Sequence, residues 1–346
     1  MKSFLSRCIL SSFFATYFVL AISPSVTTER VGAETLTIPQ SKAECVMEIN
    51  SRRVLYEEHG DVRLPMASTT KILTCATVLE NCEDLDEEFS IPPQAVGIEG
   101  SSVYLKGGEM YSVRDLLYGL MLRSGNDCAV ALALRCIGSL AEFSAEMNKT
   151  AQKAGAVHSR FENPHGLPSA NHYTTARDLS LITSYAMQNP TFREIVATKY
   201  YEKRQWKNKN KLLFRYEHVI GVKTGYTKQA GRCLVTAAQK GGMTLVCSVL
   251  NSPNMYERSV QLLDDAFSAY EYTKLLSQNE TVVVGNTNAM GIVKQDYYYP
   301  LLKEEKALLE IRTKPVENGL KNEEIVGEFE IYLSNRLLFS GNLYKL

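Results

Sequence analysis

The chain has 346 residues and balances 38 Lys+Arg against 38 Asp+Glu, so its formal net charge is zero. Its hydrophobic content of 45% is that of an ordinary globular protein. The length allows about two domains and excludes a mini-protein that needs staples to fold. The balanced charge argues against a general nucleic-acid binder, because that role usually requires a basic excess.

The N-terminus has the layout of a secretory signal peptide. Lys2 and Arg7 precede an apolar run over residues 9–22, which is shorter than the roughly 20 residues of a membrane span. Small residues up to Ala33 favour cleavage there; cleavage after Ser23, or an uncleaved membrane anchor, is the alternative. We therefore expect an exported protein, located in the cell wall or on the outer face of the cytoplasmic membrane.

The cysteines do not resemble a disulfide framework. Of the eight, Cys8 lies in the expected signal peptide, and an odd number remains in a large exported chain. Most lie among apolar neighbours, as Cys247 does, so we expect small buried side chains. The sequence allows one disulfide without identifying its partners. It contains no CxxC or CxxH pair, so a zinc site has no support.

The residues before 278 predict a mixture of helices and strands. Alternation of apolar and polar residues around a polar turn predicts a hairpin over residues 45–57. Apolar residues at helical spacing predict helices over 68–79, 113–122, 128–137, 179–187 and 256–276. Strands are expected over 219–223, 232–238 and 243–249, and the last two are apolar enough to be central.

The pattern changes after Thr281, where short strand-like runs alternate with Gly and Asn turns. The runs lie at residues 282–284, 308–311, 328–332 and 337–339. They indicate a small all-β domain. We therefore expect a signal peptide over residues 1–33, a main domain over 34–277 and a C-terminal β-rich domain over 278–346.

Three short motifs carry the chemistry of the main domain. They are Ser68-Thr69-Thr70-Lys71, Ser124-Gly125-Asn126 and Lys223-Thr224-Gly225. Each is weak alone, since an SxxK match can simply cap a helix and a second SxN match occurs near residue 252. The three together, in this order, make the signal specific: the first at the start of an expected helix, the second in a loop between helices and the third at the end of a strand. The chain has no HExxH, no GxSxG and no GxGxxG in a βαβ setting.

Ser68 and Lys71 stand three residues apart and therefore share one face of the expected helix. A serine hydroxyl is a poor nucleophile and needs a base. A lysine amine serves as that base only if burial or nearby cations lower its pKa toward neutrality, and Lys223 would be such a cation. The helix N-terminus at Ser68 also favours a developing oxyanion.

The remaining motif residues have chemically suitable side chains. Ser124 could relay a proton to the leaving amine, and Asn126 could hold the substrate's peptide bond or the lysine. Lys223 and Thr224 would bind a terminal carboxylate. Gly225 lets the backbone approach the substrate closely.

These motifs and their surroundings resemble the penicillin-binding serine DD-peptidases, and among them the low-molecular-mass D-alanyl-D-alanine carboxypeptidases. The resemblance covers roughly residues 40–275, and the β-rich tail is similar more loosely. It rests on the segments 64–71, 123–127, 161–167, 172–176 and 221–227. It implies an α/β (α+β) transpeptidase/β-lactamase-like domain with a central antiparallel sheet and a helical subdomain, followed by a small all-β domain.

The resemblance also implies a role for each motif residue. Ser68 would be the acylated nucleophile and Lys71 its base, and Ser124 and Asn126 would complete the proton relay and the grip on substrate. Lys223 and Thr224, beside Gly225, would hold the terminal D-Ala carboxylate. The backbone N–H groups of Ser68 and Tyr226 would form the oxyanion hole.

The implied reaction is removal of the terminal D-alanine from peptidoglycan stem peptides through an acyl-enzyme, without a metal or other cofactor. β-Lactams would acylate Ser68 as inhibitors. The chain ends in strand-like residues, where many relatives carry an amphipathic membrane helix. The sequence therefore leaves membrane attachment open and allows peripheral contact with the membrane or the cell wall.

Two other functions fit the sequence less well. A β-lactamase or esterase on the same scaffold is disfavoured by Gly125, where β-lactamases usually carry Asp, by the extra β domain, and because Glu162 does not match a deacylating glutamate. A non-catalytic β-lactam sensor or wall-binding protein is disfavoured because all three motifs are intact. His165 and His172 are expected to be structural, and the basic run over 203–211 to be a solvated face.

Overall fold

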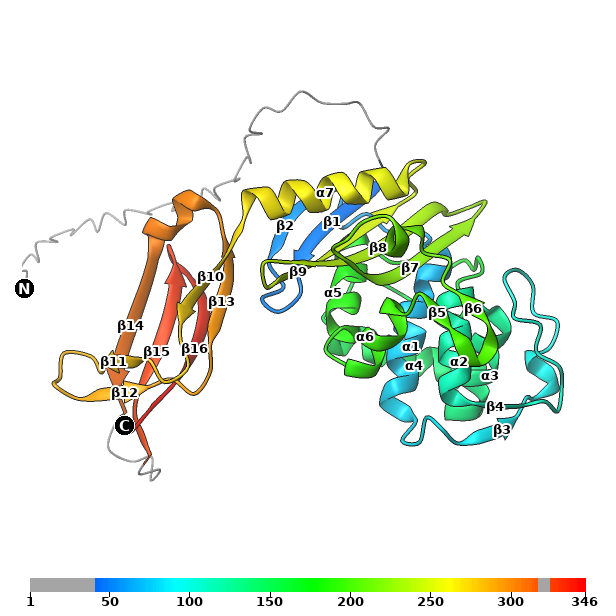
Figure 1. The fold of residues 1–346 in the computed structure, drawn as a ribbon, viewed down its shortest axis with the longest axis horizontal. Coiled ribbons are helices and arrows are strands. Elements are labelled where there is room, and N and C mark those ends of the chain that lie inside the picture. Colours follow the sequence, from blue (N-terminus) through cyan, green and yellow to red (C-terminus); the bar gives the residue numbers. More distant parts are fainter. Residues whose placement is uncertain (1–40, 317–323) are drawn as a thin grey trace, which may run out of the picture. The chain divides into compact units, whose positions relative to one another are not determined.

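The computed structural model describes residues 41–316 and 324–346 (Figure 1). The expected signal peptide and Cys8 lie outside the described residues. The described chain contains a mixed α/β part with an antiparallel sheet, followed by strands that form a second sheet. This arrangement confirms the fold class expected from the sequence.

The central sheet has five strands in the order β2-β1-β9-β8-β7, and every neighbouring pair is antiparallel. Its strands are β1 (Ala43–Glu48), β2 (Val54–Glu58), β7 (Val219–Thr227), β8 (Gly231–Lys240) and β9 (Met243–Leu250). The predicted hairpin and all three predicted strands are therefore confirmed. β1 pairs with β9, with Val46 opposite Cys247, so two strands that are far apart in the sequence lie side by side.

Both faces of the sheet are covered by helical structure. Alternate residues of its buried strands point to opposite sides, so both faces are apolar and need cover. Leu245 and Cys247 of β9 pack against α7 (Met255–Ala269), together with Leu262 and Leu263 of that helix. The other face, which includes Val246, packs against the remaining helices. Figure 1 shows α7 alone on one side of this sheet and the other helices opposite.

The helices on this second face include the elements that carry the first two motifs. The helical segments there are η1 (Ala67–Thr70), α1 (Lys71–Asn81), α2 (Val113–Tyr118), the π-helical turn η3 (Gly119–Arg123), α3 (Asn126–Ile137), α4 (Leu140–Lys153), α5 (Ala176–Ala186) and α6 (Pro190–Ala197). The helices near 68, 113, 128 and 179 match the predictions, whereas α4 and α6 were not predicted. Among the described residues, no single helix is long and apolar enough to cross a membrane. The bent pair α3 and α4 reaches that length and apolar character only when its two helices are taken together.

Short elements connect the larger ones. They are the strand pairs β3 (Glu88–Ser90) with β4 (Met110–Ser112) and β5 (Tyr200–Tyr201) with β6 (Trp206–Lys207), and the 3-10 turns η2 (Pro93–Ala95), η4 (Glu202–Arg204), η5 (Lys211–Phe214) and η6 (Lys303–Leu308). The segment between β3 and β4 contacts Asn126 of the second motif, as described below.

The predicted helix over 256–276 is wrong in its last third. The helix α7 ends at Ala269, Tyr270 is extended, and β10 (Glu271–Leu276) pairs with β13 (Tyr297–Leu301). Stacking of Tyr272 on Tyr298, with ring centroids 5.1 Å apart, accompanies the pairing. Aromatic side chains favour strands where such cross-strand neighbours exist, and the neighbour here is far away in sequence.

The strands after residue 280 confirm a second, β-rich part of the chain. Its five-stranded sheet has the order β11-β12-β16-β15-β14. These strands are β11 (Thr281–Val283), β12 (Met290–Ile292), β14 (Leu309–Pro315), β15 (Ile325–Leu333) and β16 (Arg336–Tyr344). Phe329, Ile331 and Leu343 form its core. The boundary between 277 and 278 stays a prediction; β10, which precedes it, pairs with a strand that follows it.

Cys82 and Cys136 form a disulfide. It joins the residue that ends α1 to the last turn of α3. The other described cysteines, at 45, 75, 128, 233 and 247, are free and buried, which confirms the prediction of small buried side chains for them. The bridge therefore fastens together the two helices whose first residues are Lys71 and Asn126.

Replacing Cys82 and Cys136 together by Ala should lower the free energy of unfolding by about 2–4 kcal/mol, because the bridge closes a loop across 54 residues. Guanidinium denaturation with and without reductant measures the change. The double variant should show no response to reductant, whereas the parent chain should lose the same amount when reduced. An unchanged midpoint in the double variant would contradict the prediction.

Candidate active site

The first motif begins in a tight turn that leads into α1. Ala67 has φ +50°, an uncommon conformation for a residue with a side chain. The hydroxyl of Thr69 donates to the carbonyl of Met66 at 2.7 Å, and that of Thr70 donates to the carbonyl of Ala67 at 2.8 Å. The helix expected from Ser68 therefore starts as the 3-10 turn η1, which holds the partly exposed Ser68 just before α1.

Lys71 is the first residue of α1, and its side chain is completely buried. Its Nζ atom lies 3.0 Å from Ser68 Oγ, 2.7 Å from Asn126 Oδ1 and 2.6 Å from the carbonyl oxygen of His165. The amide of Asn126 has a defined orientation, because its Nδ2 donates to the carbonyl of Glu99 at 2.5 Å. The structure thus brings residues of the first two motifs into direct contact.

Burial lowers the pKa of Lys71 well below its usual range, and the positive charges of Lys223 and Lys209 lower it further. Burial also lowers the pKa of Lys223 to about 7, again with a contribution from Lys209. An ammonium group is costly to bury, so burial favours the neutral amine at Lys71, whereas Lys223, with its pKa of about 7, still carries a charge in part of the molecules near neutral pH. The sequence-based expectation that Lys71 is buried beside a second cation is confirmed.

The second motif forms the link between two helical segments. Ser124 is buried and adopts a left-handed conformation, φ +64°, directly after η3. Asn126 then begins α3, and its N–H donates to the carbonyl of Ser101 at 2.7 Å. The neighbouring carboxylate of Asp127 accepts from the N–H groups of Val103 and Leu105, at 3.0 and 3.1 Å. The segment over 101–105 is therefore wrapped around the N-terminus of α3.

The third motif lies on β7, the last strand of the central sheet, which packs against η1. Lys223 is buried and donates from Nζ to the carbonyl of Thr224 at 2.9 Å. A Cβ atom at Gly225 would lie 3.0 Å from both Met66 O and Ser68 N. Only glycine fits this approach without a shift, so Gly225 brings the strand against the backbone of the nucleophile turn.

Tyr226 and Thr224 flank this close approach. Tyr226 is 65% exposed at the surface of β7, and Thr224 is partly exposed. Lys223 and Gly225, which alternate with them along the strand, are buried. All the motif residues singled out from the sequence thus lie on η1, on α1, on β7 or in the link from η3 into α3.

Lys209 is a site residue that the sequence analysis missed. Its Nζ donates to Ser101 Oγ at 3.3 Å, and its N–H donates to the carbonyl of Leu122 at 3.1 Å. Burial and the charge of Arg123 lower its pKa. Lys209 is exposed, as expected for a solvated basic run, and its charge also lowers the pKa of Lys223. The basic sequence pattern alone contains no signal that Lys209 lies near the motif residues.

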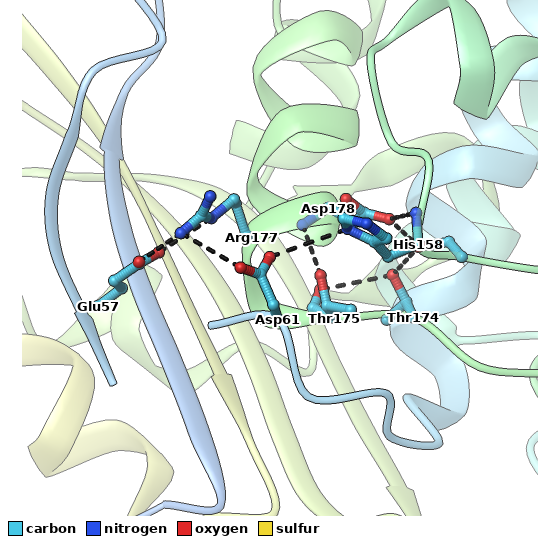
Figure 2. Close-up of polar contacts among 8 residues, drawn as sticks. Glu57, Asp61, His158, Thr174, Thr175, Arg177 and Asp178 are labelled. Atoms are coloured by element: carbon cyan, nitrogen blue, oxygen red, sulfur yellow. Dashed lines mark hydrogen bonds and ion pairs between the residues drawn. The ribbon is translucent and has the colours of Figure 1, made fainter. Parts of the chain in front are cut away.

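A polar network fixes the two segments that lead toward the site (Figure 2). The carboxylate of Asp178 accepts from the N–H of His158 and the hydroxyl of Ser159, each at 2.7 Å, and Ser159 bonds Thr174. The backbone of Thr174 exchanges two hydrogen bonds with Leu64, four residues before Ser68. These contacts join the segment before the nucleophile to the segment that contains His165.

Arg177 extends the network toward the central sheet. Its guanidinium donates to the carboxylate of Glu57 on β2, with Nε 3.0 Å from Oε2, and its Nη2 lies 3.4 Å from Asp61. Its N–H donates to the carbonyl of Gly60. In Figure 2 these side chains lie between β2 and the first turn of α5. The network is partly exposed, so we assign it an anchoring role.

The site combines serine hydroxyls, lysine amines and one side-chain amide. Across residues 41–316 and 324–346, no group of three or more His, Cys, Asp or Glu side chains is placed to hold a metal ion. The nucleophile beside an uncharged amine, with a buried lysine on the neighbouring strand, suits acyl transfer to serine.

Comparison with known proteins agrees with this geometry. The family model for D-alanyl-D-alanine carboxypeptidases, peptidase family S11, matches residues 30–254. The D-alanyl-D-alanine carboxypeptidase DacF of Bacillus subtilis is 32% identical over 291 residues, which cover 79% of this chain and 74% of the relative. The D-alanyl-D-alanine carboxypeptidase of Streptomyces sp. strain K15 is 37% identical over 227 residues, 59% of this chain and 78% of the relative.

Solved structures show the same fold. Penicillin-binding protein 5 from Haemophilus influenzae superposes with a TM-score of 0.74 at 27% identity, covering 91% of this chain and 98% of that protein. A point mutant of the Streptomyces K15 DD-transpeptidase superposes with a TM-score of 0.63 at 35% identity, covering 68% of this chain and all of that protein. Together with the family match, these similarities show that the chain belongs to the D-alanyl-D-alanine carboxypeptidase family of serine peptidases.

Proposed function

We propose that this chain removes the terminal D-alanine from peptidoglycan stem peptides that end in D-Ala-D-Ala, with Ser68 as the acylated nucleophile. The observation that carries the proposal is the contact of Ser68 Oγ with the buried amine of Lys71. Family membership gives the reaction, and the contacts of this amine supply the mechanism.

The neutral amine of Lys71 has two hydrogens and one lone pair. The oxygens of Asn126 and His165 can only accept hydrogen bonds, so they take the two hydrogens. The lone pair is then left for the third neighbour, the hydroxyl of Ser68. This arrangement orients the amine as a base toward the nucleophile.

In the acylation step, Ser68 Oγ attacks the carbonyl carbon of the penultimate D-Ala while its proton moves to Lys71. The N–H groups of Ser68 and Tyr226 receive the oxyanion, and one such donor is worth about 3 kcal/mol in other serine enzymes. The close approach of Gly225 to Ser68 N supports this placement, because it brings β7 against the nucleophile turn.

The tetrahedral intermediate collapses by breaking the peptide bond. The leaving amine of the terminal D-Ala takes a proton through Ser124, and its carboxylate binds Lys223 and Thr224. A water molecule then attacks the acyl-enzyme, releases the shortened peptide and restores Ser68. No step needs a metal or a cofactor.

A β-lactam presents a similar amide and carboxylate, so we expect it to acylate Ser68 and to leave slowly. A β-lactamase is not favoured. Glu162 lies near in sequence to His165, but its carboxylate is occupied by the hydroxyl of Ser169 and the N–H of Asn171. The Streptomyces K15 relative is called both a carboxypeptidase and a DD-transpeptidase. A direct measurement would show whether water or an amine accepts the acyl group in this chain.

We further propose that the chain is exported and acts at the cell wall or the outer face of the cytoplasmic membrane. The layout of residues 1–33, with basic residues before an apolar run, supports export. Its polymeric substrate lies outside the cytoplasm, which agrees with this location.

Replacing Ser68 by Ala should abolish release of D-alanine from a soluble acyl-D-Ala-D-Ala peptide, because the nucleophile is lost. Residues 34–346 of both proteins are assayed, and labelling by a fluorescent penicillin should vanish together with release. Equal release from both proteins would refute Ser68 as the nucleophile. Rapid steady hydrolysis of penicillin by the parent protein would instead identify a β-lactamase.

Replacing Lys209 by Gln should raise the pKa of Lys71 and of Lys223, because a neighbouring positive charge is removed. Lys71 must lose its proton to act as a base. The acid limb of kcat/KM should therefore move to higher pH. The conservative Lys209→Arg variant should keep the parent profile, as should Lys207→Gln, whose exposed side chain lies over Phe214. An unmoved limb in Lys209→Gln would contradict the prediction.

A further inference from the structure

The buried ring of His172 lies between the nucleophile turn and the segment that contains His165. Only 5% of this residue is exposed, and its ring meets the edge of Phe161 at 90°, with centroids 5.7 Å apart. Each ring nitrogen has one partner. Nδ1 lies 3.0 Å from the backbone nitrogen of Glu162, and Nε2 lies 2.9 Å from the hydroxyl of Thr70.

The chemistry of these partners determines the tautomer of His172. The N–H of Glu162 can only donate, so Nδ1 must accept and carries no hydrogen. The neutral ring therefore has its hydrogen on Nε2 and donates it to the hydroxyl of Thr70. That hydroxyl in turn donates to the carbonyl of Ala67 at 2.8 Å. Hydrogen bonds thus run in one direction from Glu162 to Ala67.

Both ends of this chain of hydrogen bonds touch the catalytic machinery. Ala67, in its left-handed conformation, directly precedes Ser68. At the other end, Glu162 begins the segment in which His165 offers its carbonyl to Lys71 at 2.6 Å. The two segments are in close contact, since a Cβ atom at Gly166 would lie only 2.0 Å from Ala67 O. The ring of His172 therefore sets the spacing between the nucleophile turn and an acceptor of the base.

We propose that His172 is a positioning residue for acylation, which holds the carbonyl of His165 and the Ser68 turn in register so that the lone pair of Lys71 points at the Ser68 hydroxyl. This inference rests on the proposed function. His172 does not touch the reacting atoms, and it acts through Thr70 on one side and through residues 162–165 on the other.

Protonation would break this chain of hydrogen bonds, because a hydrogen on Nδ1 would face the N–H of Glu162, and two donors cannot pair. Burial lowers the pKa of His172 to about 4; the Glu162 carboxylate raises it and the charge of Lys71 lowers it. The nearby His165 ring is also neutral, since burial and Lys71 lower its pKa to about 3. The chain from Glu162 to Ala67 therefore stays intact near neutral pH.

Other contacts hold the same segment when His172 is changed, so the variants should fold. The side chain of Asn148 pairs with the backbone N–H and carbonyl of Phe161, at 3.0 and 2.7 Å. The hydroxyl of Thr74 on α1 donates to the carbonyl of Pro164 at 2.7 Å. These bonds retain the segment near the site but do not specify its spacing from Ala67.

The test compares two variants. His172→Phe keeps an aromatic ring but loses both ring nitrogens, and Thr70→Val loses only the hydroxyl. The comparison separates the orientation of the Lys71 amine from the binding of the ligand. Stopped-flow acylation of residues 34–346 by a chromogenic β-lactam gives the first-order acylation constant and the dissociation constant of the complex before acylation. Both variants should lose at least tenfold in the acylation constant, with dissociation constants within twofold, because Lys223 and Thr224 are untouched.

Three further proteins make the result decisive. Thr70→Ser restores the hydroxyl and should recover most of the acylation constant. The double variant of His172→Phe and Thr70→Val should be no slower than the slower single variant, because both changes interrupt one chain of hydrogen bonds. The matched control is His158→Phe, which should acylate as the parent does. The imidazole of His158 is half exposed, and its contact with Asp61 is long, at 3.9 Å.

Parent-like acylation in His172→Phe would overturn the positioning role, and so would failure of Thr70→Ser to recover the rate. An equal loss in binding and acylation, with a melting temperature lowered in proportion, would also overturn it in favour of a structural role. Ser68→Ala in the same assay reports on the proposed function separately: continued acylation there would refute the nucleophile, whatever His172 does.

Discussion

The burial of an uncharged amine at Lys71 is the constraint on which the rest of the site depends. A buried amine without partners would be costly, and a protonated one more so. The structure meets this cost with two fixed carbonyl oxygens and with positive neighbours that keep the proton away. The same arrangement that makes burial tolerable also leaves one direction for the lone pair, toward Ser68. Stability and chemistry therefore make the same demand on this side chain.

Three distant parts of the chain have to meet at that amine. Asn126 arrives at the start of α3, the carbonyl of His165 arrives on a segment without regular structure, and Lys223 arrives on the last strand of the sheet. Each arrival is held by contacts that do no chemistry. The Asp178 network ties down the segment before Ser68, and the Cys82–Cys136 bridge joins the far ends of α1 and α3. The catalytic geometry is thus a property of the anchoring contacts as much as of the motif residues.

The motifs and the central strands could be predicted because their signals are local. Spacing places Ser68 and Lys71 together, and continuous apolar runs identify β8 and β9. Prediction failed where the deciding partner is remote. Residues 271–276 continue a helical pattern until the pairing of β10 with β13 makes them a strand. Lys209 is exposed like other residues of the basic run, and only the fold places its Nζ beside Ser101. The disulfide partners could not be identified either, because their proximity exists only after α1 and α3 have packed.

By itself the sequence determined the likeness to one family and pointed to Ser68 as nucleophile, Lys71 as base and residues 223–225 as a carboxylate-binding segment, since these inferences depend on residue type and on spacing within a single element. Only the tertiary structure decided that burial lowers the pKa of Lys71, that the charge of Lys209 acts on the site, and that His172 has its hydrogen on Nε2. The physical reason is that a pKa or a tautomer depends on what surrounds a group within a few ångströms. Those surroundings come from segments that are close in space and far apart along the chain.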